Sequence, residues 1–236
     1  VSAYRQWLLE ACESLQIPEI ALVDEPTAAA LGAGLPAGSK LLVVDLGGGT
    51  LDLSLVALEG GEGRAAPLAQ LLRFQSRNLT KSRQTLRQAR VLGKAGIALG
   101  GRDLDRWILD ALQPQGLPSE GDEYTALLDA AERLKCRLSN TEINDEQELT
   151  ELASSSEMTT PTTLRMNRKR FTQLLEERGL FQLLEELLNQ TLRAAEVHGC
   201  RRSDLNAVVM VGGGAHLPQL RAWLTSFMSP IPLRTP

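Results

Sequence analysis

Apolar runs along the chain predict several strands. Two continuous runs, residues 41–45 and 207–211, have the length and composition of buried strands. A shorter strand is expected at residues 20–23, and leucines alternate with other residues over residues 51–58, as in a strand with one buried face. Only glycines and one threonine separate residues 41–45 from residues 51–58, so these two strands are predicted to form a hairpin.

Apolar residues at helical spacing predict helices between these strands. The stretches 104–112, after Gly100 and Gly101, and 123–138 each carry one apolar stripe, and an amphipathic stretch opens the chain and ends near Gln16. An alanine-rich helix is expected over residues 27–33, with Pro26 at its first position. Asn167 is expected to cap one long helix that ends at His198-Gly199. The alternation of strands and helices predicts an α/β fold with a mixed sheet.

Charge is unevenly distributed along the chain. Residues 64–102 hold nine basic residues and no acidic one, so the remaining 16 basic residues face all 29 acidic ones, a net charge of −13. Arg83, Arg87, Arg90 and Lys94 of this basic stretch would share one face of a helix, but an extended structure is an open alternative. A solvated hairpin extension is favoured over a surface for an anionic partner.

Composition restricts the class of protein further. The three cysteines are far apart and include no Cys-x-x-Cys pair, so they indicate neither a disulfide framework nor a zinc ribbon and favour a reduced, cytoplasmic environment. No apolar run approaches the roughly 18 residues of a membrane helix. The chain starts without Met and directly on an amphipathic stretch, so it is expected to be part of a longer protein.

The glycine turn of the hairpin is the strongest chemical signal. In Asp45-Leu46-Gly47-Gly48-Gly49-Thr50, backbone N–H groups without neighbouring Cβ atoms can approach a phosphate, and Thr50 adds a hydroxyl donor. Asp45 would repel phosphate unless a divalent cation lay between them, and Mg²⁺ held mainly through water is the natural choice. Asp52 could join the same cation shell or orient a water. The turn joins two strands, so it is not a P-loop. The alternative is an ordinary hairpin turn.

Two further features gain weight beside the hairpin. Val211-Gly212-Gly213-Gly214-Ala215 joins a buried strand to a helix, and it is either a close packing contact or a second wall of a nucleotide cleft. Glu25 precedes a helix and is expected either to cap it or to hold a water bound to Mg²⁺.

Taken together, these segments resemble the 70-kDa heat-shock (DnaK-type) chaperone family, in the right order over nearly the whole chain. The resemblance implies the C-terminal two-thirds of that family's nucleotide-binding domain, an actin-like ATPase lobe. The segments that carry it are Glu25-Pro26-Thr27-Ala28-Ala29-Ala30-Leu31, Asp45-Leu46-Gly47-Gly48-Gly49-Thr50-Leu51-Asp52, Leu99-Gly100-Gly101-Arg102-Asp103-Leu104-Asp105 and Val211-Gly212-Gly213-Gly214-Ala215-His216-Leu217-Pro218.

The resemblance also implies roles for individual residues. Glu25, Asp45, Asp52 and Thr50 take the catalytic positions, and Asp45 and Asp52 are placed around Mg²⁺, through water. The residues implied to bind ATP or ADP are Gly47, Gly48, Gly49, Thr50, Gly101, Glu132, Lys135, Ser139, Gly212, Gly213, Gly214 and His216. Cys136 stands where some members of the family have an arginine, and Gly214 and His216 replace a usual serine and a common arginine. These departures predict weaker stacking on adenine, with stacking by His216 itself as the alternative.

The resemblance implies a division of the chain. Residues 1–38 would be the tail of a first lobe with a connecting helix, and residues 39–100 with 167–236 the core of a second lobe. Residues 101–166 would form a smaller inserted α+β subdomain. The family's first phosphate hairpin and catalytic lysine would lie upstream, so the isolated chain is expected to bind nucleotide weakly and hydrolyse ATP poorly.

The function implied is that of a chaperone whose ATP hydrolysis controls peptide binding, with co-chaperones and a nucleotide-exchange factor as partners, a role in stress response, and no membrane or nucleic acid. One alternative is a non-catalytic actin-like scaffold or regulatory nucleotide-binding protein. A relative of sugar kinases is disfavoured by the chaperone-like segments. Docking of nucleic acid or an acidic protein on the basic stretch is a fourth hypothesis.

Overall fold

The computed structural model describes most of the chain. Most of the predicted first helix and much of the basic stretch lie outside the described residues. Among the described residues, no helix is long and apolar enough to cross a membrane. The described parts are residues 20–22, 25–59, 70–72, 88–112, 120–156, 158 and 160–234, together with Trp7 and Ala11.

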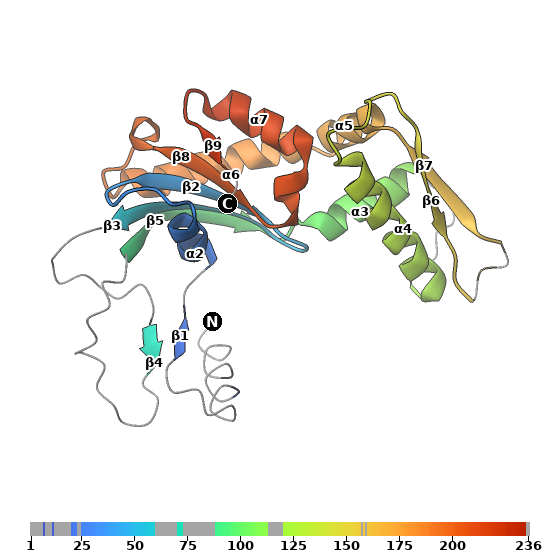
Figure 1. Cartoon of the computed structure of the whole chain (residues 1–236), viewed down its shortest axis with the longest axis horizontal. Helices are drawn as coiled ribbons and strands as arrows, with labels where there is room; N and C mark the ends of the chain where they lie inside the picture. Colours follow the sequence, from blue (N-terminus) through green and yellow to red (C-terminus); the bar gives the residue numbers. More distant parts are fainter. Residues whose placement is uncertain are drawn as a thin grey trace.

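A five-stranded mixed sheet organises the larger part of the molecule (Figure 1). Its strand order is β5-β3-β2-β8-β9; β2 pairs antiparallel with β3, and β3 antiparallel with β5. On the other side β2 pairs parallel with β8, and β8 parallel with β9. The predicted hairpin and mixed sheet are therefore confirmed. The strands are β2 (Lys40–Leu46), β3 (Leu51–Glu59), β5 (Gln88–Ile97), β8 (Ala207–Val211) and β9 (Leu233–Arg234).

Both faces of the sheet are covered. Alternate side chains of β2 point to opposite faces, so Leu42 and Val44 join the large core under α6 and α7, while Leu41 and Val43 join a smaller core that includes Ala30 of α2. Figure 1 shows α2 on one face and α6 and α7 on the other. This explains why β2 reads as a continuous apolar run. The helices are α2 (Glu25–Gly32), α6 (Leu180–Glu196) and α7 (Pro218–Met228).

A smaller α+β group lies beyond the turn end of the hairpin (Figure 1). Its two strands, β6 and β7, form their own antiparallel sheet, and α4 packs on both. Elsewhere, β1 (Ile20–Leu22) pairs antiparallel with β4 (Gln70–Leu72). The elements of the group are α3 (Gly101–Leu112), α4 (Asp122–Leu138), β6 (Leu149–Ala153), β7 (Thr162–Met166) and α5 (Arg168–Glu177).

The prediction of one long helix after Asn167 is wrong. Asn167 does cap a helix, because its Oδ1 accepts a hydrogen bond of 2.8 Å from the Arg170 backbone N–H. That helix, α5, ends at Glu177, and α6 starts after Gly179, whose φ of 73° is left-handed. A residue in that conformation ends a helix, so the continuous apolar stripe hides a break.

The basic stretch forms strands over β4 and most of its described second half, and its last residue, Arg102, lies in α3. Arg90 and Lys94 lie on β5, so the helical alternative is wrong for these two residues. Arg83 and Arg87 lie outside the described residues. Arg90 forms an ion pair of 2.9 Å with Glu59 on the neighbouring strand.

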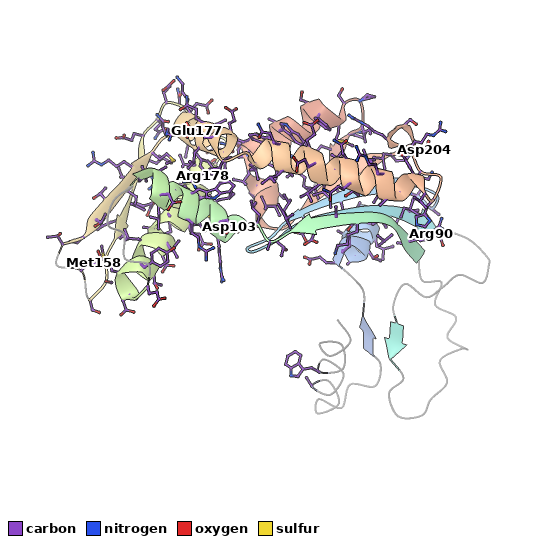
Figure 2. All side chains as sticks on the ribbon, turned by 180° about the vertical axis from the view of Figure 1, so that it is seen from behind. Arg90, Asp103, Met158, Glu177, Arg178 and Asp204 are labelled. Carbon is purple, nitrogen blue, oxygen red and sulfur yellow. The ribbon has the colours of Figure 1, made fainter. Side chains whose placement is uncertain are left out.

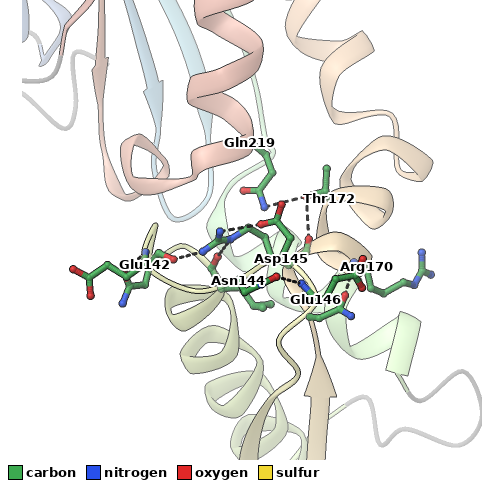
Figure 3. Close-up of polar contacts among 11 residues, drawn as sticks. Glu142, Asn144, Asp145, Glu146, Arg170, Thr172 and Gln219 are labelled. Atoms are coloured by element: carbon green, nitrogen blue, oxygen red, sulfur yellow. Dashed lines mark hydrogen bonds and ion pairs between the residues drawn. The ribbon is translucent and has the colours of Figure 1, made fainter.

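Polar contacts join α5 to α7 and to the end of α4 (Figure 3). The Gln219 amide on α7 donates a hydrogen bond of 3.2 Å to Thr172 Oγ1 on α5. Arg168, at the start of α5, donates to the backbone oxygens of Leu138 and Asn140 and pairs with Asp145 at 3.0 Å. Because the Arg168 side chain is nearly buried, it fixes the end of α4 against the start of α5.

Helix and sheet approach each other very closely at Gly93. A Cβ atom on Gly93 of β5 would clash with the Thr191 carbonyl oxygen and lie 2.9 Å from the Ala195 backbone nitrogen, both on α6. We therefore expect Gly93→Ala to push α6 away from the sheet and to lower the free energy of unfolding by about 2 kcal/mol. Chemical denaturation measures this change.

Gly32→Ala is the matched control. Gly32 lies in α2, has ordinary helical backbone, and a Cβ there would meet no atom within 4 Å. This substitution should leave stability unchanged or raise it by a few tenths of a kcal/mol, roughly. Equal destabilisation of the two variants would contradict the packing argument.

Candidate functional site

The register of the hairpin brings two predicted carboxylates together. Asp45 of β2 lies directly opposite Asp52 of β3, and Gly47 N–H donates a hydrogen bond of 2.9 Å to the Thr50 carbonyl oxygen to close the turn. Gly48, Gly49 and Thr50 are exposed. The turn thus presents bare backbone to solvent directly beside two acidic side chains.

The start of α3 docks on this turn. The backbone N–H groups of Gly101 and Arg102 donate to the carbonyl oxygens of Gly47 and Gly48 at 2.8 and 2.9 Å. A Cβ on Gly100 would clash with the backbone nitrogen of Gly49 and lie 2.5 Å from the Gly48 carbonyl carbon. Only glycine permits this approach, which explains the Leu99-Gly100-Gly101 segment.

The second glycine turn packs against the same strand end. Gly212 has a left-handed φ of 75°, and a Cβ there would lie 2.5 Å from Asp45 Oδ1. A Cβ on Gly214 would clash with the Leu46 side chain. The turn continues as a short 3₁₀ helix, η2 (Gly213–His216), before α7. The packing alternative predicted for this turn therefore holds for Gly212 and Gly214.

A cavity of about 660 Å³ lies where these segments meet α4, within the volume range of small-molecule sites. It brings together nine of the predicted nucleotide-binding residues. Gly49, Thr50, Gly212 and the three carboxylates Glu25, Asp45 and Asp52 do not line it. The nine lining residues are Gly47, Gly48, Gly101, Glu132, Lys135, Ser139, Gly213, Gly214 and His216.

Several lining residues were not predicted from the sequence. Leu46, Leu104 and Leu217 give the cavity an apolar wall, and Arg102 and Asn140 line its polar parts. The three leucines read as core residues in the sequence, because burial beneath a cavity and burial in a core leave the same pattern. Cys136 lines the cavity as an exposed thiol.

Lys135 joins α4 to the start of α3. Its Nζ lies 2.7 Å from Asp105 Oδ1 and donates to the Gly101 carbonyl oxygen at 2.8 Å. Both side chains are almost buried, at 13% and 5% exposed. Burial raises the pKa of Asp105, and the contact with Lys135 opposes that effect. Lys135 therefore holds the cavity wall together, a role that its predicted contact with adenosine did not include.

The carboxylates form a separate group on the α2 face of the sheet. Side chains two positions apart on a strand share a face, so Asp45 lies on the same face of β2 as Leu41 and Val43. This is the face that α2 covers. Burial is the main cause that raises the pKa of Asp45 from 3.8 to about 6, and the charge and hydrogen bond of Glu25 and the charge of Asp52 add to it. Lys94 acts in the opposite direction.

The donor set suits Mg²⁺ bound through water. Carboxylate oxygens are hard ligands, and the exposed backbone of the turn leaves room for phosphate oxygens beside them. Among the described residues no group of three His, Cys, Asp or Glu side chains is placed to hold a metal ion directly. Asp45 and Asp52 would therefore hold the cation through its water shell.

The fold and the arrangement of glycine turns define the class of this protein as an actin-like ATPase lobe. The chain belongs to the Hsp70 protein family, whose family model matches residues 3–65 and 91–235. The resemblance predicted from the motifs is thus confirmed. The unmatched residues between these two segments fall inside the basic stretch.

Individual relatives carry chaperone names. The chain is 29% identical over 226 residues to the chaperone protein DnaK of Stenotrophomonas maltophilia, a match that covers 89% of this chain and 30% of the relative. It is 30% identical over 226 residues to the chaperone protein DnaK of Trichormus variabilis, with 92% of this chain and 28% of the relative covered. The chain therefore spans less than a third of the length of these relatives.

The Lys135–Asp105 pair yields the first prediction for the site. Lys135→Met should lower the free energy of unfolding by about 3 kcal/mol, because Asp105 would keep a buried charge without a partner. The double variant Lys135→Met with Asp105→Leu should recover most of that loss. Urea denaturation of both variants measures the two effects.

Lys169→Met is the control for this pair. Lys169 forms an ion pair of the same 2.7 Å length with Glu146, but both side chains are exposed. Its loss should leave stability unchanged, since exposed pairs contribute little. A Lys135→Met variant as stable as the Lys169→Met variant would show that the buried pair does not hold the wall.

The raised pKa of Asp45 predicts a pH dependence. Between pH 4 and about pH 6 the folded state binds more protons at Asp45 than the unfolded state, so stability falls as the pH rises through this window. The shift corresponds to about 3 kcal/mol, which solvent screening of this half-exposed group reduces to about 1 kcal/mol. Asp45→Asn should remove this loss and be the more stable protein at pH 7.

Denaturation curves from pH 4 to pH 8 test this expectation. Asp129→Asn, at an exposed position on α4, serves as the control and should retain the wild-type pH profile. A wild-type profile for Asp45→Asn would contradict the assignment of this pH dependence to Asp45.

Proposed function

We propose that this chain is the nucleotide-binding part of a DnaK-type chaperone and binds ATP and ADP with Mg²⁺. The observation that carries the proposal is the cavity between the hairpin turn, the start of α3, α4 and η2. It joins two glycine turns, an exposed helix face and an apolar wall. This combination suits a ligand with an apolar ring at one end and phosphates at the other.

In this proposal the turn binds the phosphates. Within the described part of the chain, the N–H groups of Gly48 and Gly49 donate to no protein acceptor, so they are available to anionic oxygens. Thr50 adds a hydroxyl at the same turn. The nucleoside would lie in the cavity between Glu132 and Lys135 of α4 and Gly213 and His216 of η2.

The carboxylates would act on the other side of the turn. When bound, Mg²⁺ supplies positive charge that neutralises the phosphates. Asp45 and Asp52 would orient its water shell, and Glu25 would orient a further water toward the terminal phosphate. Catalysis would then consist of positioning and charge neutralisation, without a covalent intermediate on the protein.

The partners of the whole protein belong to the same proposal. Hydrolysis would control peptide binding by a domain outside this chain, with co-chaperones and an exchange factor acting on the cycle. The chaperone names of the curated relatives support this part of the proposal. We further propose that the whole protein works in the cytoplasm during stress.

A second candidate is a regulatory protein that binds nucleotide without turnover. It is favoured by the pairing of Asp52 with Lys94 at 3.4 Å, because this contact occupies one of the carboxylates proposed for catalysis. Hydrolysis assays on the longer protein separate the two candidates. Nucleotide-dependent conformational change without phosphate release would favour the regulatory protein.

Filling the cavity from its glycine wall tests the proposal. A Cβ on Gly213 would meet no atom within 4 Å, and its φ is not left-handed, so Gly213→Val should fold with an unchanged melting temperature. The new side chain would occupy the space proposed for the nucleoside and should weaken ADP binding at least tenfold, roughly. Isothermal titration calorimetry with ADP and Mg²⁺ measures this.

Gly32→Val is not a suitable control, because a β-branched residue would also disturb a helix; Gly32→Ala serves instead and should bind ADP as the wild type does. Undiminished ADP affinity in a correctly folded Gly213→Val variant would place the nucleotide elsewhere and reject the proposed site.

A further inference from the structure

Lys94 lies beside the carboxylate group without being part of any predicted site. On β5, Lys94 lies opposite Ser54 of β3. Two positions further along the same pair of strands, Gly96 lies opposite Asp52. Residues two apart on a strand share a face, so Lys94 projects on the same side as Asp52. Its Nζ lies 3.4 Å from Asp52 Oδ1.

The backbone of β5 leaves room for Asp52 to make this contact. A Cβ atom on Gly96 would lie 2.5 Å from Asp52 Oδ1, so any larger residue would displace the carboxylate. The Asp52 side chain therefore rests on bare backbone at Gly96 and reaches the ammonium group of Lys94. Two features of one strand thus set the position of Asp52.

The contact places one positive charge among three negative ones. Glu25, Asp45 and Asp52 share one end of the α2 face, and Lys94 is the cation whose charge acts on Asp45. An ammonium group is a compact point charge on a flexible stem, so it can neutralise carboxylates without fixed coordination geometry. The Lys94 side chain is 55% exposed and is free to move outward when a stronger cation arrives.

We propose that Lys94 is a built-in cation that competes with a divalent cation for Asp52. In the free protein its ammonium group would stand in for Mg²⁺. Binding of the divalent cation would release Lys94, which then points toward solvent or toward a phosphate at the turn. The inference rests on the proposed function only in taking Asp52 as a residue that holds the cation.

Competition predicts how the affinity for a divalent cation changes when Lys94 loses its charge. In Lys94→Gln, Mn²⁺ would no longer displace an ammonium group from Asp52. Mn²⁺ affinity, measured without nucleotide by electron paramagnetic resonance, should rise about tenfold for a charge removed at this range. The exposed position of Lys94 means that the variant should fold normally, which circular dichroism checks.

Arg90→Gln is the matched control. Arg90 lies on the same strand, is similarly exposed at 59%, and also pairs with one carboxylate, Glu59. Figure 2 shows Arg90 at the end of the sheet away from Asp103 and the hairpin turn. It lies four positions from Lys94 along the strand, about 13 Å, which exceeds the Debye length in ordinary salt. This variant should bind Mn²⁺ as the wild type does.

A double-mutant cycle assigns the effect to Asp52. In an Asp52→Asn background, Lys94→Gln should change Mn²⁺ affinity by less than twofold, because the contested carboxylate is gone. The inference is overturned if Lys94→Gln and Arg90→Gln bind Mn²⁺ equally. It is also overturned if Lys94→Gln does not bind Mn²⁺ at millimolar concentration, or if the tenfold effect persists without Asp52.

Nucleotide binding is measured separately, so that the two ideas can fail independently. The dissociation constant of ADP is measured by calorimetry in EDTA and in Mg²⁺. The ratio of the constant in EDTA to the constant in Mg²⁺ should be about tenfold larger for Lys94→Gln than for the wild type. A wild-type protein that binds no ADP, together with the full Mn²⁺ effect, would reject the proposed function and leave the competition intact.

Discussion

The contact of bare backbone between Gly100 and the hairpin turn is the constraint on which the rest of the site depends. It lets two N–H groups at the start of α3 reach the carbonyl oxygens of Gly47 and Gly48. Because α3 begins there, α4 and its Lys135 fall into place across the cavity. A methyl group on Gly100 would push the start of α3 away from the hairpin turn. The sheet and the α+β group would then separate, and the walls of the cavity would move apart.

Much of this arrangement could be predicted from the sequence, because glycine at a strand end leaves a strong local signal. The hairpin, the mixed sheet and the cap at Asn167 all follow from local patterns of residues. The break at Gly179 could not be predicted in the same way, since its neighbours continue an apolar stripe of helical spacing. Whether a glycine ends a helix or is tolerated within it depends on packing between distant segments.

The sequence did not predict that the site consists of two groups, the residues that line the cavity and the carboxylates on the α2 face. Strand alternation places Leu46 toward the cavity and Asp45 toward the opposite face, so neighbouring residues serve different purposes. The roles of Lys135 and Lys94 depend on partners 30 or more residues away in the chain. Spacing within a motif carries no information about such partners. Lys94 in particular lies in a basic stretch whose sequence is compatible with either a helix or a strand.

The carboxylate group explains why a positive side chain would be kept beside it. Asp45 is half-buried against Glu25 and opposite Asp52, an arrangement that costs stability whenever all three are charged. A protein that only needed to fold would replace one of them. Retaining all three makes sense if a cation binds there during function, and the free protein then needs another charge in the meantime. Lys94 supplies that charge from the neighbouring strand. Because its side chain is flexible and exposed, it can leave Asp52 when another cation binds.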